Sequence, residues 1–171
     1  MPSDPKPHRR SIRLPNYDYA QPGAYFVTLV TSGREPLFGH IDTTGMHLNA
    51  NGDVATACWQ DLVDHYPNLS LDEFVVMPNH VHGLLFLTDP GRAGYKPAPT
   101  ERYALPEIVR GFKTFSARRV NELRGTQGIA VWQRNYYEHV VRDDAELDRV
   151  REYIRNNPAQ WSLDKYNPAH Q

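Results

Sequence analysis

The stretch FVVMPNHVHGLLFL, residues 74–87, contains two strand-like runs separated by Pro78-Asn79. Residues 74–77 and 80–87 are rich in valine, leucine and phenylalanine, a composition typical of strands. The second run stays apolar on the side opposite its histidines, which predicts a central strand buried on both faces. Pro78-Asn79 predicts a bulge, or a bend where one strand enters the next.

Strands and helices are expected to alternate on both sides of this stretch. The pattern predicts strands at 24–31, 46–48 and 136–141, with Val131-Trp132 extending the last. It predicts a helix that starts at 51–53 and ends by Pro67, and another at 105–123 with Pro106 in its first turn and Gly125 after it. Asp143 is expected to cap a last helix, with Glu146 as capping-box partner, and Pro158 to end it.

This order of elements predicts an α+β fold. An antiparallel sheet with helices packed mainly on one face fits it best, in a ferredoxin-like arrangement. Prolines at positions 2, 5, 7, 15 and 22 indicate that residues 1–23 form an irregular arm. Residues 24–171 are then expected to form a single domain, with 88–103 as an exposed loop inside it.

Composition narrows the class of protein. The chain has 171 residues, which fits one domain. Cys58 is the only cysteine, so no intrachain disulfide and no thiolate metal cluster can form. The first ten residues lack a signal-peptide pattern, and the longest apolar stretch is too short to span a bilayer. We therefore expect a soluble, cytoplasmic protein that does not bind membranes.

Basic residues form two clusters although the net charge is only −1. A neutral total can conceal a basic face and an acidic face, and a basic face would suit nucleic acid. The alternative is an ordinary solvated helix surface. The first cluster lies in the arm and the second in the helix at 105–123; the candidate DNA-binding residues are Arg9, Arg10, Arg13, Arg110, Lys113, Arg118 and Arg119.

The first candidate chemistry comes from His80 and His82. Two residues apart on a strand, their side chains point to the same face and can bind one divalent ion together. A pair of hydrogen-bonded histidines is the alternative, because His-x-His is common. If the third ligand is an amide oxygen, Mg²⁺ or Mn²⁺ is favoured over zinc.

A second candidate lies on the last helix. Tyr153 and Asn157 are four residues apart and therefore lie on one helix face. Asn157 could offer its carbonyl oxygen to a metal towards which Tyr153 directs its hydroxyl. A phenol with a pKa of about 10 needs a base or a metal-activated phosphate to act as nucleophile. A tyrosine covering the core beside a helix-ending asparagine would look the same.

The ordered set of motifs resembles the REP-associated tyrosine transposases, within the single-tyrosine HUH transposases. The matching segments are RRSIRL at 9–14, GAYFVT at 23–28, VVMPNHVHG at 75–83, VWQRNYYEH at 131–139 and YIRNNP at 153–158. The resemblance implies that His80, His82 and Asn157 bind a divalent metal and that Tyr153 is the nucleophile. It also implies cleavage and rejoining of single-stranded or hairpin DNA through a 5′-phosphotyrosine link.

Several alternatives stay open at the level of sequence. Tyr136 or Tyr137 could be the nucleophile, and Glu138 or His139 a ligand. The chain could bind hairpin DNA without cutting it, or use a metal-activated water as a nuclease. A replication initiator would share the tyrosine chemistry, but the short chain without a helicase segment favours a transposase. A monomer is favoured over a dimer.

Overall fold

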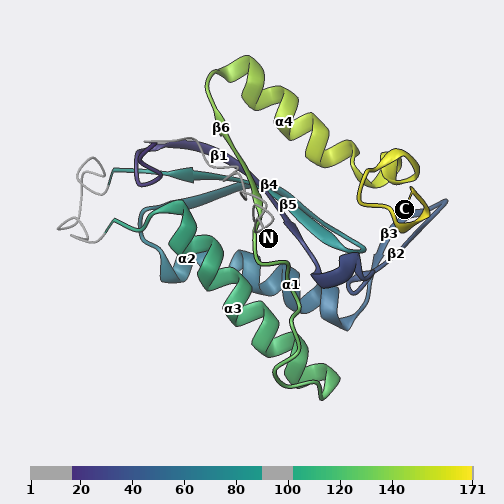
Figure 1. The fold of residues 1–171 in the computed structure, drawn as a ribbon. Coiled ribbons are helices and arrows are strands. Elements are labelled where there is room, and N and C mark those ends of the chain that lie inside the picture. The colour runs from purple at the N-terminus through teal and green to yellow at the C-terminus, as the bar shows by residue number, and fades with distance from the viewer. Residues whose placement is uncertain (1–16, 90–101, 171) are drawn as a thin grey trace, which may run out of the picture.

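The fold is built on a four-stranded antiparallel sheet. A computed structural model describes residues 17–89 and 102–170 (Figure 1). The strand order is β4-β5-β1-β6, with neighbours antiparallel throughout. The strands are β1 (Gly23–Val30), β4 (Leu69–Met77), β5 (His80–Leu87) and β6 (Tyr137–Val141). Together with the intervening helices, this order is the βαββαβ ferredoxin-like arrangement, so the predicted α+β class is confirmed.

Helices cover the two faces of the sheet unequally. One face carries α1 (Ala50–Gln60), α2 (Leu62–His65) and α3 (Leu105–Arg124), and the other carries α4 (Asp144–Asn156), drawn in yellow-green in Figure 1. A hairpin of β2 (Gly39–Asp42) and β3 (Gly45–Leu48) extends beyond the sheet. Short 3₁₀ turns are η1 (Ser32–Arg34), η2 (Pro158–Leu163) and η3 (Pro168–His170).

Alternation along β5 divides the interior into two cores. Val81 and Leu85 belong to the larger core, with residues of α1 and α3. Leu84 points the other way and packs with Phe26 of β1 and Ile154 of α4 in a smaller core. Both faces of β5 are therefore buried, as its sequence predicts.

Several predicted features were wrong. Pro78-Asn79 is the turn of the β4–β5 hairpin and neither a bulge nor a bend. Val131-Trp132 is not part of β6, and Trp132 forms an isolated bridge with Thr31. The first predicted helix is two helices, α1 and α2, separated at Asp61, and Asn49 rather than residues 51–53 caps its start by accepting from the backbone amides of residues 51 and 52. Strand β4 begins at Leu69 instead of residue 74, with a register shift between Leu71 and Phe74. The polar pair Asp72-Glu73 at this bulge concealed the strand, since it breaks the apolar pattern.

Those two acidic residues attach α4 to the sheet. Arg151 binds Asp72 through two nitrogens, at 2.6 and 3.2 Å. Arg155 also donates from two nitrogens, but both bonds go to a single oxygen, Oε1 of Glu73, at 2.8 and 2.7 Å. The Arg151 guanidinium holds the pKa of Asp72 below its ordinary value, so this pair is present at neutral pH. Its contribution to stability begins to decline below the ordinary carboxyl pKa of about 4 and is lost as the pH falls through the lowered pKa.

The predicted capping of α4 is present in a modified form. Asp143 accepts from the Glu146 amide at 2.8 Å, as expected for the N-cap. The Glu146 carboxylate accepts from the Arg142 amide, one residue before the cap, and also lies 2.8 Å from His139 Nε2. His139 therefore pairs with the start of α4 and lies away from the histidine pair.

Some predictions lie outside the described residues. These include Arg9, Arg10 and Arg13 in the arm and most of the loop at 88–103. Within 17–89 and 102–170, no helix is long and apolar enough to cross a membrane.

Gly83 tests the packing of the larger core. A methyl group at this position would overlap the six-membered ring of Trp59, a residue of α1 that packs over Gly83. Gly83→Ala should lower the free energy of unfolding by about 1–3 kcal/mol, measured by urea denaturation. In a Trp59→Phe background, which removes the overlapping atoms, the cost of Gly83→Ala should shrink by about 1 kcal/mol. Equal costs in both backgrounds would contradict this account.

Candidate active site

His80 and His82 face each other beneath α4. Their Nε2 atoms are 3.1 Å apart, and both side chains are buried. They project from the same face of β5, as expected for strand residues two apart. Buried imidazoles need hydrogen-bond partners, and these partners determine where each ring carries its proton.

The protonation of His80 follows from its neighbour Asn79. The Asn79 side-chain nitrogen donates to the carbonyls of Arg34 and Tyr166, at 3.0 and 2.7 Å, which fixes the orientation of this amide. Its oxygen then faces His80 Nδ1 at 2.9 Å and can only accept. His80 therefore carries its proton on Nδ1 and presents a lone pair at Nε2.

His82 can adopt either tautomer because its Nδ1 partner is a hydroxyl. Thr28 Oγ1 lies 2.8 Å from His82 Nδ1 and can donate or accept. When Thr28 donates, His82 Nε2 carries the proton and donates to His80. When Thr28 accepts, two Nε2 lone pairs converge, an arrangement that a bound cation would stabilise.

Burial keeps both rings neutral. It lowers the pKa of His80 to about 4, against the opposing charge of Asp164 and a contact with Asn157. Burial and the neighbouring His80 lower the pKa of His82 well below its ordinary value. Neutral imidazole is the form that binds metals, so the pair is ready to act as ligands near neutral pH.

Helix α4 brings Tyr153 and Asn157 to this pair. Tyr153 Oη lies 3.3 Å from His82 Nε2, and the Tyr153 ring packs edge-on against His82 and Phe26. Asn157 follows the last residue of α4 in helical conformation and is buried. Its Oδ1 has no hydrogen-bond partner among residues 17–89 and 102–170. A buried, unpaired amide oxygen beside two imidazoles is a suitable ligand for a hard cation.

Tyr153 is protonated in this environment. Burial, followed by the charge of Asp164, raises its pKa above the ordinary value, while Asn157 lowers it slightly. The side chain is still 41% exposed and borders a pocket of about 250 Å³ that includes Asn157, Asp164 and Lys165. A substrate can therefore reach the hydroxyl from solvent.

Asp164 joins the site although no sequence pattern pointed to it. Its Oδ2 lies 3.7 Å from His80 Nε2, and ligand atoms of His80, His82 and Asp164 lie within 4.8 Å of one another. The 3₁₀ turn η2 returns the chain after Pro158 and so places Asp164 over the histidines. These three buried residues can hold a divalent metal ion.

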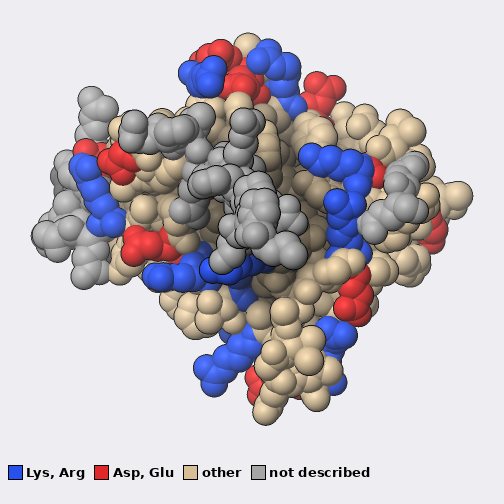
Figure 2. Space-filling model, viewed as in Figure 1, with Lys and Arg blue, Asp and Glu red and all other residues tan. Residues whose placement is uncertain are grey.

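The predicted basic residues of α3 have different surroundings. Lys113 donates to the backbone carbonyls of residues 133, 134 and 135, at 2.9, 3.4 and 3.0 Å, which occupies all three of its donors. Arg119 pairs with Asp61 at 3.2 Å. Arg110 and Arg118 are exposed and form no ion pair in the described part of the chain. Figure 2 shows basic side chains over α3, and acidic and basic ones together where α4 begins.

The alternative residues lie at the edge of the site or outside it. Tyr137 packs against Phe26, with ring centres 6.2 Å apart, and is 44% exposed. Tyr136 lies on the other side of the sheet, against Lys113. Of the tyrosines considered, Tyr153 is the one in hydrogen-bonding distance of the histidine pair.

Two curated proteins resemble this chain in sequence over most of its length. The chain is 39% identical to an uncharacterised protein of Haemophilus influenzae over 92% of both chains. It is 26% identical to another protein of that organism, one named for the REP-associated tyrosine transposases, over 86% of this chain and 77% of that one.

A comparison of folds also finds a REP-associated tyrosine transposase. A solved REP-associated tyrosine transposase, bound to a REP hairpin, superposes with a TM-score of 0.59 at 17% identity and covers 91% of this chain and 76% of that one. The family model described as "Transposase IS200 like" matches residues 55–157, a range that contains His80, His82, Tyr153 and Asn157. The chain therefore belongs to the IS200-like transposases and resembles the REP-associated tyrosine transposases in sequence and fold.

Proposed function

We propose that this transposase is a metal-dependent endonuclease and strand transferase that acts on single-stranded, hairpin-containing DNA through a 5′-phosphotyrosine intermediate. The observation that carries the proposal is the convergence of four groups. Tyr153 Oη lies 3.3 Å from His82 Nε2, which in turn lies 3.1 Å from His80 Nε2. The fourth group is the Oδ1 of Asn157, which is unpaired among the described residues. This is the set of groups needed to join a tyrosine to a phosphate.

The donor set fits a divalent cation. His80, His82 and Asn157 would be its ligands, and Asp164 would add a carboxylate oxygen. Mixed nitrogen and oxygen donors with room for a phosphate oxygen suit Mg²⁺ or Mn²⁺. When bound, the ion would supply Lewis-acid polarisation of the scissile phosphate.

Tyr153 would carry out the covalent step. Its Oη attacks phosphorus, the bond from phosphorus to the 3′ oxygen breaks, and the released strand ends in a 3′-hydroxyl. The phenol proton leaves as the new bond forms, because the raised pKa keeps Tyr153 protonated beforehand. The 3′ oxygen takes up one proton, so the step is balanced. A 3′-hydroxyl can reverse the reaction and rejoin strands without an external energy source.

The same geometry favours a single chain working alone. Tyr153 reaches His82 within one chain, which supports a helix that acts in cis, a monomer and a single domain over residues 24–171. The DNA partner is inferred from the hairpin bound by the solved relative. Arg110 and Arg118, together with Arg9, Arg10 and Arg13, are the cations proposed to contact its phosphates; Lys113 and Arg119 would have to give up their present partners.

The covalent adduct is the decisive observation for this proposal. Labelled hairpin DNA from the neighbourhood of the gene should give a shifted band on a denaturing gel with Mg²⁺ or Mn²⁺. Tyr153→Phe should abolish that band, and a chelator should do the same. Tyr136→Phe and Tyr137→Phe are matched controls that should retain it. Cleavage without an adduct would instead identify a water-using nuclease, and binding with neither would identify a hairpin-binding module.

Thr28 provides a separate test of the metal. Thr28→Val keeps the shape of the side chain but removes the partner of His82 Nδ1. Mn²⁺ affinity, measured by isothermal titration calorimetry, should fall about 10–100-fold, because such partners orient the ligand ring. Thr88→Val, which removes a hydroxyl bound to the Asn68 carbonyl, should bind Mn²⁺ like the unmodified chain. Unchanged affinity in Thr28→Val would count against His82 as a ligand.

A further inference from the structure

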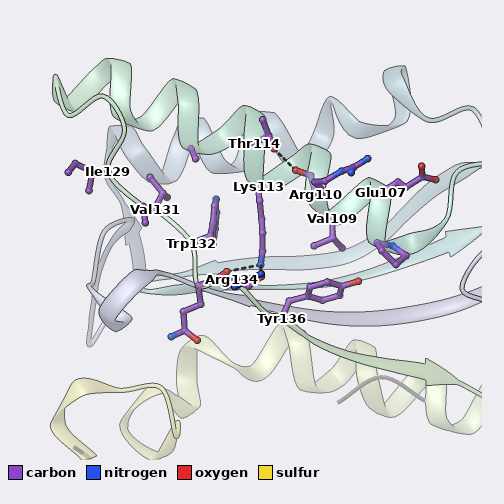
Figure 3. Close-up of a pocket in the computed structure, with 14 residues that line it drawn as sticks. Glu107, Val109, Arg110, Lys113, Thr114, Ile129, Val131, Trp132, Arg134 and Tyr136 are labelled. Carbon is purple, nitrogen blue, oxygen red and sulfur yellow. Dashed lines mark hydrogen bonds between the residues drawn. The ribbon is translucent and has the colours of Figure 1, made fainter. Parts of the chain in front are cut away.

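A larger cavity lies across the sheet from Tyr153. It is formed between α3 and the segment 129–136 that leads into β6 (Figure 3). Its volume is about 550 Å³, compared with about 250 Å³ beside Tyr153. This volume lies in the range of small-ligand sites. None of the residues proposed to bind metal or attack DNA lines it.

The walls of this cavity are apolar and aromatic. Val109 of α3 and Val131 of the opposite segment are buried at its base, beside Trp132. The Trp132 nitrogen donates to Ser116 at 2.9 Å, so this ring is held in place. Tyr136 is half-buried at one end of the cavity. Apolar walls with an aromatic ring accommodate an unstacked nucleobase, since every base has a flat face.

Lys113 holds the two walls together. It extends from α3 across the cavity to the backbone of residues 133–135 (Figure 3). Its ammonium also lies 5.3 Å from the centre of the Tyr136 ring. Because all three of its donors bind backbone carbonyls, Lys113 fixes the shape of the cavity. An anionic ligand would therefore have to bind other cations.

Those other cations are Arg110 and Arg134. Both are exposed in the lining of the cavity, and neither forms an ion pair within residues 17–89 and 102–170. Glu107 is the acidic residue of the lining, and one of its oxygens already accepts from the Ala104 amide. Two unpaired guanidinium groups around an apolar cavity match a ligand that has a flat apolar part and anionic groups, as a nucleotide does.

The cavity connects with the tyrosine site around the edge of the sheet. Strand β6 is an edge strand, and Tyr137 at its start pairs with Thr28 of β1. Tyr137 packs on Phe26, whose ring centre lies 5.9 Å from that of Tyr153. Tyr136 and Tyr137 thus face opposite sides of the sheet, one in the cavity and one beside the nucleophile. A DNA strand that bends around this edge would contact both.

On the basis of the proposed function, we infer that this cavity binds an unpaired nucleotide flanking the hairpin of the DNA substrate. The base enters between α3 and the segment 129–136 and packs against Tyr136 and the apolar base of the cavity. The adjoining phosphates contact Arg110 and Arg134. The cavity is thus a second DNA-binding site, on the face of the sheet opposite the metal ligands.

A base-by-base removal experiment tests this inference. A hairpin oligonucleotide with single-stranded flanks is prepared as a series in which each flanking nucleotide in turn is abasic but keeps its phosphate. At one flanking position, loss of the base should weaken binding to the unmodified chain about five- to tenfold, the size expected for one stacked base. Ala117→Phe should erase that penalty, because Ala117 lines the cavity four residues after Lys113 on the same helix face.

Matched variants control for folding and for general charge. Leu123→Phe adds a ring to an exposed position of the same helix outside the cavity and should keep the abasic penalty. In the double variant Arg110→Ala/Arg134→Ala, the slope of log affinity against log salt concentration should become less steep. The change should be about 0.7 for each phosphate that the variant no longer binds. Thermal melts would verify that each variant is folded; if Ala117→Phe is not, the double arginine variant decides.

The outcomes separate this inference from the proposed function. A Tyr153 adduct with no sensitive flanking base, or with a penalty that Ala117→Phe leaves intact, overturns the cavity as a nucleotide site. An unchanged salt dependence in the double arginine variant also overturns it. An abasic penalty that Ala117→Phe erases, without any adduct, supports the cavity and rejects cleavage. Failure of the unmodified chain to bind the flanked hairpin overturns both.

Discussion

Strand β5 has to supply apolar side chains to the larger core from one face and the two histidines to the candidate site from the other. The rest of the molecule is arranged around this strand. Its pleat sends Val81 and Leu85 into the larger core and His80 and His82 to the other face. A shift of one residue in its pairing with β1 would exchange these faces and bury the imidazoles among α1 and α3. After such a shift His82 or Leu84 would stand where Gly83 now faces Trp59, and its side chain would overlap the indole ring, which opposes the shift. Correct register is thus a condition for both the core and the site.

The residues that the sequence made predictable are those whose partners are local. His80 with His82, and Tyr153 with Asn157, follow from strand and helix periodicity alone. Thr28 could not be found in this way, because it meets His82 only through the register of β1 and β5. The fixed amide of Asn79 depends on carbonyls 45 and 87 residues away. Periodicity contains no information about contacts of that range.

Because periodicity does not reveal long-range contacts, the sequence could not show which charged residues join the candidate site or which are already paired. Asp164 arrives through a turn after the last helix, with no periodic relation to the histidines. Lys113 stood out as a basic residue among others, yet its ammonium is used by backbone carbonyls on the facing segment. The fold class was predictable because it needs only the order and kind of elements, whereas the roles of single cations depend on which carbonyl or carboxylate each one meets.

Helix α4 is attached differently from the helices on the other face, and this difference bears on how a substrate reaches Tyr153. Its apolar contact is the smaller core around Ile154, supplemented by ion pairs to Asp72 and Glu73. Few buried apolar contacts imply a lower local free energy of opening than in α3, whose apolar stripe lies in the larger core. The histidines, in contrast, belong to a central strand paired on both sides. Tyr153 and Asn157 are therefore carried by a less firmly held element than His80 and His82, so small movements of α4 would shift the phenol and the amide without disturbing the two imidazoles.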